Sequence, residues 1–211
     1  MTSRTLPLAA VCLAALLALC ACSASSPPVR LHTLMPAEPT PRDPAVRGTA
    51  VFVALESIRL PAQVDQPQWL VRLPDESLAS LEQERWASPL RDELRQALLE
   101  QLAARFGVVE GRGTAPQSAP PLRVALELRR FDSIPDREAR VEASWTVAPP
   151  GGAATLRCAV LVREPAAGGM PELAAAHRRA VVRLADAIGA SLVALQAGSA
   201  ATACPAGDPP R

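Results

Sequence analysis

A cysteine near the N-terminus is the residue best placed for covalent chemistry. Cys22 ends the run Leu19-Cys20-Ala21-Cys22, which follows an apolar, Ala- and Leu-rich stretch over residues 6–19. A basic start with Arg4, an apolar stretch and small residues at its end are typical of a secretory signal peptide. A small residue directly before the cysteine, with Leu19 three positions upstream, predicts the lipoprotein variety. Such a segment is cleaved before Cys22, and the new N-terminal cysteine carries acyl chains.

Other interpretations of the N-terminus fit less well. The apolar stretch is shorter than the ~20 residues that span a bilayer, which argues against a permanent transmembrane anchor. Ordinary secretory cleavage would need an A-x-A-like site, and none is well placed. Cys20 fits less well as the lipidated residue, because bulky Leu19 would precede the cleavage site. Two positions before Cys22, however, Ala, Ser or Thr is the usual residue, and Cys20 departs from that pattern. The prediction is a signal peptide over 1–21, then the lipidated Cys22 and a tether over 22–30.

Two further cysteines remain after cleavage. Of the five cysteines, Cys22, Cys158 and Cys204 survive, and lipidation uses the first. An even pair in an oxidising compartment can form a disulfide, here tying the C-terminal tail to the folded body. The alternative is that Cys158, on the apolar side of a strand, is a small buried hydrophobe.

The sequence offers little for catalysis or for metal and cofactor binding. Its histidines are His32 and His177, predicted on a strand and a helix, where exposed or satisfied histidines are the ordinary case. Zinc-protease, nucleophile-elbow, dinucleotide-binding and Cys-x-x-Cys motifs are missing. The absence of lysine excludes Schiff-base and P-loop chemistry. We therefore predict a binding or assembly protein, not an enzyme, with no catalytic residue, metal or cofactor.

The charge balance excludes another class of partner. The chain has 22 basic and 21 acidic residues, and removal of the signal peptide takes Arg4 away. A mature charge near zero gives no reason to expect nucleic acid. The scattered acids between Asp65 and Glu84 are better explained as solvated surface groups than as an acid–base pair.

The elements that position these residues follow from the periodicity. Short strands are expected over 31–35, 51–55 and 68–73, and a helix begins at Ser88-Pro89 and ends at Gly107. Three strands over 122–129, 140–147 and 156–163 alternate apolar and polar residues, which is typical of antiparallel pairing. A second helix runs over about 171–196. This order predicts an α+β fold with a largely antiparallel sheet and two long helices packed on one face, a domain over 31–196 and a flexible tail over 197–211.

Three sequence clusters stand out between Leu60 and Leu90. Their residues are Leu60-Pro61, Asp65-Gln66-Pro67-Gln68, Val71-Arg72 and Arg85-Trp86-Ala87-Ser88-Pro89-Leu90. These clusters resemble the PqiC family, the auxiliary lipoproteins of ABC-type and MCE-type envelope transport systems. In that family the first cluster usually reads L-D-R-P-Q followed by a T-R or similar pair, and the second reads R-W-A-E-P-L. Phe131-Asp132, Trp145 and the Ala-rich last helix also match. Gln66 and Ser88 depart from the pattern, as does Leu31-His32-Thr33-Leu34 in place of Tyr-Tyr-x-Leu.

The resemblance implies a function and a set of partners. Family members look like non-catalytic docking components, on the periplasmic face of the outer membrane, for a tunnel-forming MCE protein that moves lipids between membranes. It also implies a homo-oligomer, and Ser23 beside the modified cysteine fits outer-membrane sorting. Candidate partner or subunit contacts are Asp65, Gln66, Pro67, Gln68, Arg72, Arg85 and Trp86. Trp86 could instead pack the helix start against the sheet, and 65–68 could be a simple turn.

Two other functions remain open from the sequence. An assembly lipoprotein would help an outer-membrane barrel or a secretion complex to form. A lipid-anchored hydrolase would need a nucleophile–base pair in a pocket, and exposed, unpartnered His32 and His177 would exclude it.

Overall fold

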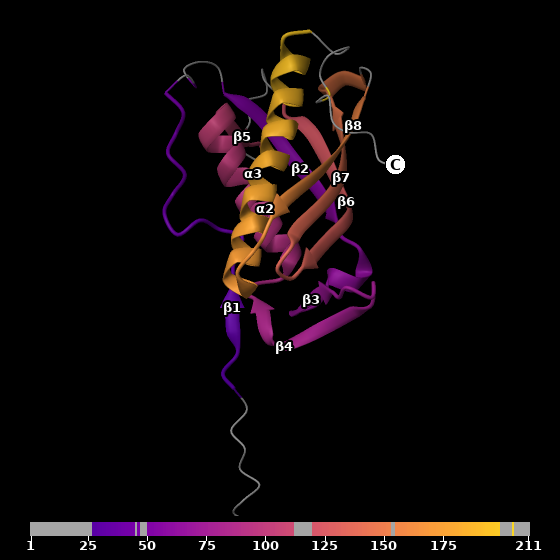
Figure 1. Ribbon diagram of the computed structural model, residues 1–211. Coiled ribbons are helices and arrows are strands. Elements are labelled where there is room, and N and C mark those ends of the chain that lie inside the picture. Colours follow the sequence, from indigo (N-terminus) through magenta and orange to yellow (C-terminus); the bar gives the residue numbers. More distant parts are fainter. Residues whose placement is uncertain are drawn as a thin grey trace, which may run out of the picture.

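Two β-sheets and two long helices make up the part of the chain that the structure describes. The structure is a computed structural model, and it describes residues 27–44, 46, 50–111, 120–152, 155–198 and 204. Figure 1 shows the larger sheet beside the helices, with β1, β3 and β4 together at the lower end of the molecule. The N-terminal strand therefore enters the body at that end.

The larger sheet has five strands in the order β5-β2-β6-β7-β8. Their bounds are β2 Val51–Arg59, β5 Val108–Glu110, β6 Leu122–Ile134, β7 Glu138–Ala148 and β8 Leu156–Pro165. β6, β7 and β8 form an antiparallel meander, whereas β2 runs parallel to both of its neighbours. The smaller sheet has the order β1-β4-β3, with β1 Arg30–His32, β3 Gln68–Arg72 and β4 Leu78–Trp86. In it β1 is parallel to β4, and β3 is antiparallel to β4.

The prediction of a largely antiparallel sheet is wrong, because both sheets are mixed. The meander over β6–β8 is antiparallel as its alternation predicted. β2, however, reaches β5 and β6 only through the long crossover of β3, β4 and α2. A crossover of that length returns the chain to the starting end, so the next strand enters parallel. The α+β class itself is confirmed.

The helices are α2 Leu90–Phe106 and α3 Gly169–Gln196, and short 3₁₀ turns lie at η1 Ala62–Val64 and η2 Pro150–Gly152. Pro89 takes the cap position of α2 that Ser88 was expected to hold, and no side chain caps the helix start. Ser88 Oγ instead donates to Oε1 of Glu93 at 2.8 Å. Gly107, with φ of 66°, ends α2 in the left-handed conformation that favours glycine.

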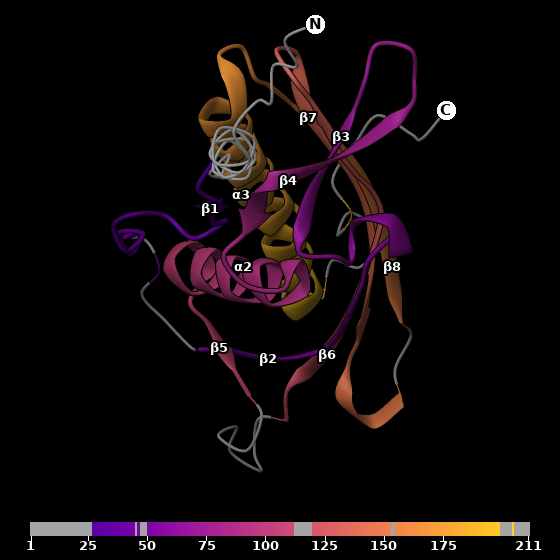
Figure 2. The same ribbon diagram turned by 90° about the horizontal axis from the view of Figure 1, so that it is seen from below.

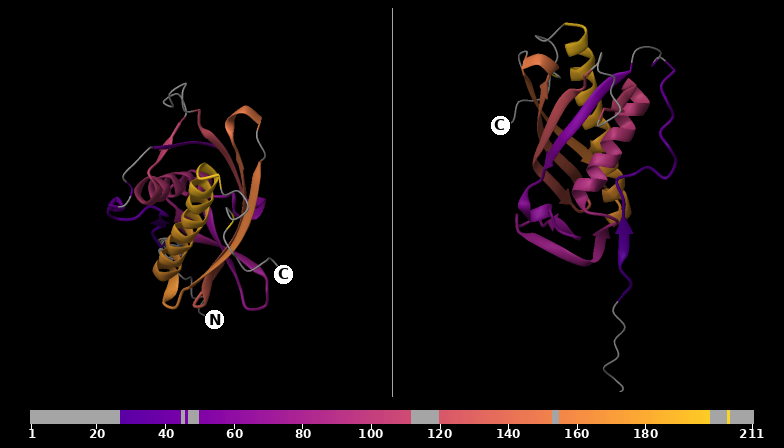
Figure 3. Two further views of the ribbon diagram at one scale, coloured as in Figure 1. Left: turned by 90° about the horizontal axis from the view of Figure 1, so that it is seen from above. Right: turned by 180° about the vertical axis from the view of Figure 1, so that it is seen from behind.

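The helices pack on each other and on the larger sheet. α2 lies against β2 and β5, and α3 lies against β7 and β8, as Figures 2 and 3 show from three directions. Gly189 of α3 lets Phe106 of α2 approach, since an added Cβ would lie 2.3 Å from the ring. Between them the core is filled by fully buried side chains such as Leu94, Leu184 and Trp145. The narrower prediction, that both helices cover one face of one sheet, stays a prediction. None of the helices in the described ranges is both long and apolar enough to cross a bilayer.

Candidate functional site

Cys22 and Cys204 lie near the two ends of the chain, and Cys158 lies within the folded domain. Cys22 falls outside the described residues, so its lipidation stays a prediction. The Sγ atoms of Cys158, on β8, and Cys204 are joined in a disulfide, and their Cα atoms are 5.3 Å apart. Cys158 is 7% exposed, and its Sγ lies 3.7 Å from Oγ of Ser191 on α3. The disulfide thus ties position 204 to the edge strand of the larger sheet.

The predicted contact segment over 65–68 forms the turn between η1 and β3. The Asp65 carboxylate receives a hydrogen bond of 2.7 Å from Arg91 Nη2, which links the turn to the first turn of α2. The Pro67 carbonyl accepts a hydrogen bond from the Trp86 backbone N–H at 3.3 Å. These contacts favour the turn interpretation of the segment. Asp65 and Pro67 are exposed, so a partner could still reach them.

Gln66, Gln68 and Arg85 are half-buried at the same sheet. Gln68 on β3 is the register partner of Arg85 on β4, so the two sequence clusters do meet in space. The Arg85 guanidinium bonds only a backbone carbonyl in the described part of the chain, that of Glu82. Contact of these residues with a partner stays a prediction.

Arg72 joins the two sheets through a buried carboxylate. Its Nη2 lies 3.1 Å from Oδ1 of Asp132 on β6, and Arg130 Nη1 lies 3.1 Å from the other oxygen. The Asp132 side chain is 3% exposed, and a buried charge of this kind needs such partners. Arg72 therefore has a structural partner within the chain.

Trp86 lies in an aromatic cluster that connects the smaller sheet to β6 and α3. It is 6% exposed, and its ring centroid is 4.3 Å from that of Trp69. Phe131 and His177 meet it edge-on at 6.0 and 5.9 Å. This burial favours packing over the role of interface anchor.

A hydrogen-bond chain runs through the same cluster. Trp69 Nε1 donates to Ser133 Oγ at 2.7 Å, and Ser133 Oγ is also 2.7 Å from His177 Nε2. The His177 ring stacks on Phe131 with centroids 4.2 Å apart. Burial lowers the pKa of His177 to about 3, although the charge of Asp132 opposes the shift. His177 is therefore neutral at ordinary pH.

The Ser133–His177 pair has the atoms of a nucleophile and a base, but it is sealed. Ser133 is 2% exposed and His177 is fully buried. A serine nucleophile must reach the substrate, and here its oxygen already accepts the Trp69 N–H. His32 has a partner too, because its Nε2 lies 2.6 Å from Oε2 of the buried Glu84. His32 is thus paired within the fold, and His177 bonds Ser133 through Nε2, whereas its buried Nδ1 has no hydrogen-bond partner among the described residues. The Ser133–His177 pair is internal and closed to substrates.

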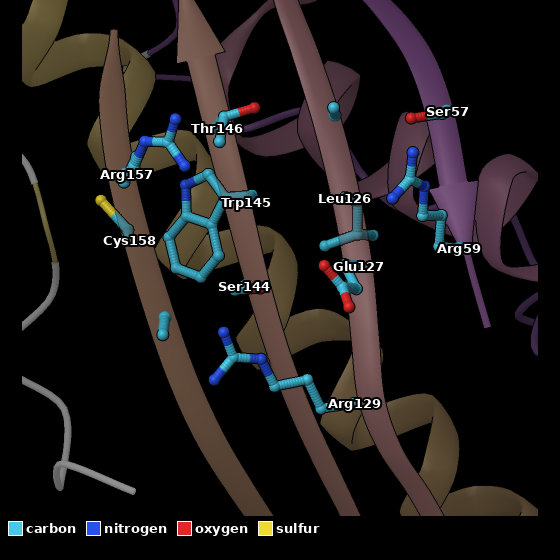
Figure 4. A pocket seen from close by; sticks show the side chains of 12 residues that line it. Ser57, Arg59, Leu126, Glu127, Arg129, Ser144, Trp145, Thr146, Arg157 and Cys158 are labelled. Atoms are coloured by element: carbon cyan, nitrogen blue, oxygen red, sulfur yellow. The ribbon is translucent and has the colours of Figure 1, made fainter. Parts of the chain in front are cut away.

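An open groove of about 510 Å³ is lined by residues of β2, β6, β7 and β8 of the larger sheet. Small side chains from four strands form its floor, and Figure 4 shows them with the longer residues around them. The floor residues are Ser57, Ala125, Ser144, Thr146 and Ala159. Alternation explains this floor, since their inward neighbours such as Trp145 and Leu126 belong to the core. Trp145 also lines the groove, and its buried Nε1 has no hydrogen-bond partner in the described part of the chain.

Three arginines rim the groove. Arg59 comes from β2, Arg129 from β6 and Arg157 from β8, and all three are exposed. Glu127 is the one acidic residue among the lining residues. Within the described residues, none of these four charged groups has an ion pair within 4 Å. The groove thus carries an excess of two uncompensated positive charges.

Sequence reasoning missed both the groove and the Trp69–Ser133–His177 chain. The alternation did place Arg129 and Arg157 on outward faces of their strands. Their meeting with Arg59 depends on the strand order, in particular on β2 lying beside β6. No local sequence signal reports that order.

The comparisons with known proteins give a fold and a family. Residues 32–189 match the family described as "ABC-type transport auxiliary lipoprotein component". The crystal structure of XCC0632 from Xanthomonas campestris is similar with a TM-score of 0.60 at 18% identity, covering 81% of this chain and 98% of that one. A crystal structure of an uncharacterized protein has a TM-score of 0.56 at 14% identity, covering 66% and 90%. At such identities the structures show a shared fold. No curated protein matches the chain.

The family match covers both sheets apart from the first two residues of β1, together with α2 and most of α3. It also covers all three sequence clusters that resemble the PqiC family, and it confirms that resemblance. The chain belongs to the family of ABC-type transport auxiliary lipoprotein components.

Proposed function

We propose that the chain is a non-catalytic lipoprotein subunit of an MCE/ABC-type intermembrane lipid transport system. In this proposal, acyl chains on Cys22 hold it on the periplasmic face of the outer membrane. There it docks the periplasmic MCE-domain protein as a homo-oligomer. The observation that carries the proposal is the family match over residues 32–189. An auxiliary role without chemistry also agrees with a serine–histidine pair that is closed to substrates.

The position of the tether supports an arrangement with the smaller sheet on the membrane side of the domain. β1 begins at Arg30, eight residues after Cys22. A fully extended tether of that length spans at most about 28 Å. β1 lies at the end of the body that the smaller sheet forms (Figure 1). Leu31, Leu73 and Leu78, all on or beside the strands of that sheet, are large apolar side chains with 37–64% exposure. The lipid would therefore hold the smaller sheet near the bilayer, with the groove on a side wall that a periplasmic partner can reach.

The anchor is tested by replacing the lipidated cysteine. We expect Cys22→Ser to abolish palmitate labelling and to leave the protein unprocessed or released from membranes. Cys20→Ser is the matched control, two residues away, and should be labelled and sorted to the outer membrane like the wild type. A mature-sized Cys22→Ser product that still sediments with the outer membrane would refute the anchor.

The docking role is tested by gentle detergent extraction and purification of the tagged wild-type chain. We expect an MCE-domain protein to co-purify, together with more than one copy of the chain. Recovery of free monomer alone would contradict the proposal. Capture of a barrel or secretion subunit in place of the MCE protein would support the assembly alternative.

A further inference from the structure

We propose that the groove rimmed by Arg59, Arg129 and Arg157 binds an acidic polypeptide segment of a partner protein. The identity of that partner as a transport component rests on the function proposed above, but the chemistry of the groove does not. Three properties of the groove lead to this occupant: its unpaired charges, the spacing of those charges, and its floor.

The arginines of the groove differ from Arg130 and Arg140 on the same sheet face. Further along β6 and β7, Arg130 and Arg140 pair with acidic side chains of the same two strands: Arg130 with Asp132 and Glu142, and Arg140 with Glu138. The three groove arginines have no such partner in the described ranges, although Glu127 is the register partner of Arg59. Three arginines that stay unpaired around one groove present a site for external anions. Guanidinium groups bind carboxylates with paired, charge-assisted hydrogen bonds.

The spacing of the arginines favours a chain with several carboxylates over a single anion. Arg59 and Arg157 stand on β2 and β8, which are three strand spacings apart, about 14 Å. Figure 4 shows the three guanidinium groups at separate places around the floor, none directed at a common point. One phosphate or carboxylate group could meet one or two of them. Acidic residues spaced along one polypeptide can meet all three.

The floor explains how a polypeptide fits. Its side chains are short, so a main chain can lie close to the sheet, and Ala125 and Ala159 give it an apolar surface. The hydroxyls of Ser57, Ser144 and Thr146 make no hydrogen bond within the described residues and can bond an incoming chain. β6 and β7 are internal strands whose backbone groups already pair within the sheet. The occupant is therefore recognised by side chains and not by addition of a strand.

The test uses the full chain in detergent and a fluorescent ten-residue polyglutamate peptide as the probe. We expect saturable binding by fluorescence anisotropy that weakens steeply between about 0.05 and 0.5 M salt. Arg59→Gln, Arg129→Gln and Arg157→Gln should each weaken binding about threefold to fivefold, and the triple variant roughly thirtyfold to a hundredfold. Glu127→Gln should tighten binding, because it removes the one like charge from the groove.

The matched control is Arg163→Gln. Arg163 is exposed on the same strand as Arg157, also has no ion pair in the described ranges, and lies outside the groove. Its replacement should change affinity less than twofold. Equal losses for Arg163→Gln and the groove variants, or unchanged binding by the triple variant, would overturn the proposal. So would groove-dependent binding to phosphatidylglycerol vesicles, or displacement of the peptide by millimolar inorganic phosphate, since either would assign a small anionic group. Thermal unfolding of each variant is measured as well, to check that the substitution leaves the fold intact.

Co-purification separates this inference from the proposed function. If the groove binds acidic peptide but the wild-type chain captures no MCE-domain protein, the proposed function fails and the inference of peptide binding is upheld. If the wild type and the triple variant capture the MCE protein equally, the function stands and the groove is not its docking site.

Discussion

His177 makes a quantitative prediction about stability in acid. Burial lowers its pKa to about 3 in the folded protein, whereas an unfolded histidine titrates near 6.5. Between these two pH values the unfolded chain binds one proton that the folded chain does not. The stabilising contribution of the neutral ring is thus complete above pH 6.5, and it is lost as the pH falls below that value.

The size of the effect follows from proton linkage. Each pH unit in this window costs about 1.4 kcal/mol, which amounts to about 2 kcal/mol between pH 7 and pH 5. The folded-state pKa of His177 lies below pH 5. The loss between pH 7 and pH 5 therefore depends only on the pKa of histidine in the unfolded chain. That loss is a substantial fraction of the about 5–15 kcal/mol that stabilises a typical domain.

Urea unfolding from pH 7.5 to pH 4.5 measures it, with His177→Gln as the reference. Glutamine can keep a hydrogen bond with Ser133, whose Oγ is 2.7 Å from His177 Nε2, but it does not titrate. His32 and the carboxylates are present in both proteins, so their contributions cancel in the difference. We expect the stability difference between wild type and variant to fall by about 2 kcal/mol from pH 7 to pH 5. Parallel pH profiles for the two proteins would show that His177 is hydrated or charged in the fold, and the reasoning would fail.

Three further predictions concern stability. Gly189→Ala should lower the unfolding free energy by about 1–3 kcal/mol, since its Cβ would lie 2.3 Å from the Phe106 ring; an unchanged thermal midpoint would mean that the helices do not meet there. Cys204→Ser should lower the free energy of unfolding by urea by up to about 4 kcal/mol, because the disulfide to Cys158 spans a separation of 46 residues. The wild type in reductant should then be as stable as the variant. Glu93→Ala should lower the unfolding free energy by about 2–4 kcal/mol, measured by circular dichroism melts. The Glu93 carboxylate accepts three hydrogen bonds, one of them from the buried Leu34 N–H at 2.8 Å. A loss below about 0.5 kcal/mol would contradict that role.

Elements with a strong period could be predicted from the sequence. The apolar residues every four positions over Leu90–Phe106 marked α2, and Gly107 marked its end. The alternation over β6, β7 and β8 gave both their existence and their antiparallel pairing. In each case one face of the element is buried, and the residues on that face recur at the period of the helix or the strand.

β4 and the parallel pairings could not be predicted in the same way. Burial alternates along Leu78–Trp86, but its residue types do not, because charged Glu84 stands at a buried position and the polar Gln83 and Arg85 at half-buried ones. The sequence therefore gives no period-two signal for this strand. Its pairing with β1 and β3 brings residues together that are far apart in sequence, as in Arg30 with Glu84. Nor does the sequence show that Ser133 and His177, 44 residues apart, share a hydrogen bond.

The place of β2 between two parallel neighbours imposes an order on the folding of the chain. Val51 pairs with Val108 and Val53 with Leu122, so β2 has no strand partner in the larger sheet until residues more than 50 positions further along the chain reach it. The β6–β7–β8 meander can instead close through short turns, and such local contacts form faster than distant ones. During that interval the run Val51-Phe52-Val53-Ala54-Leu55 has two open edges and high strand propensity, which is the pattern that drives aggregation between chains. The unfolded chain therefore depends on protection of its second strand until residues near 127 pair with it.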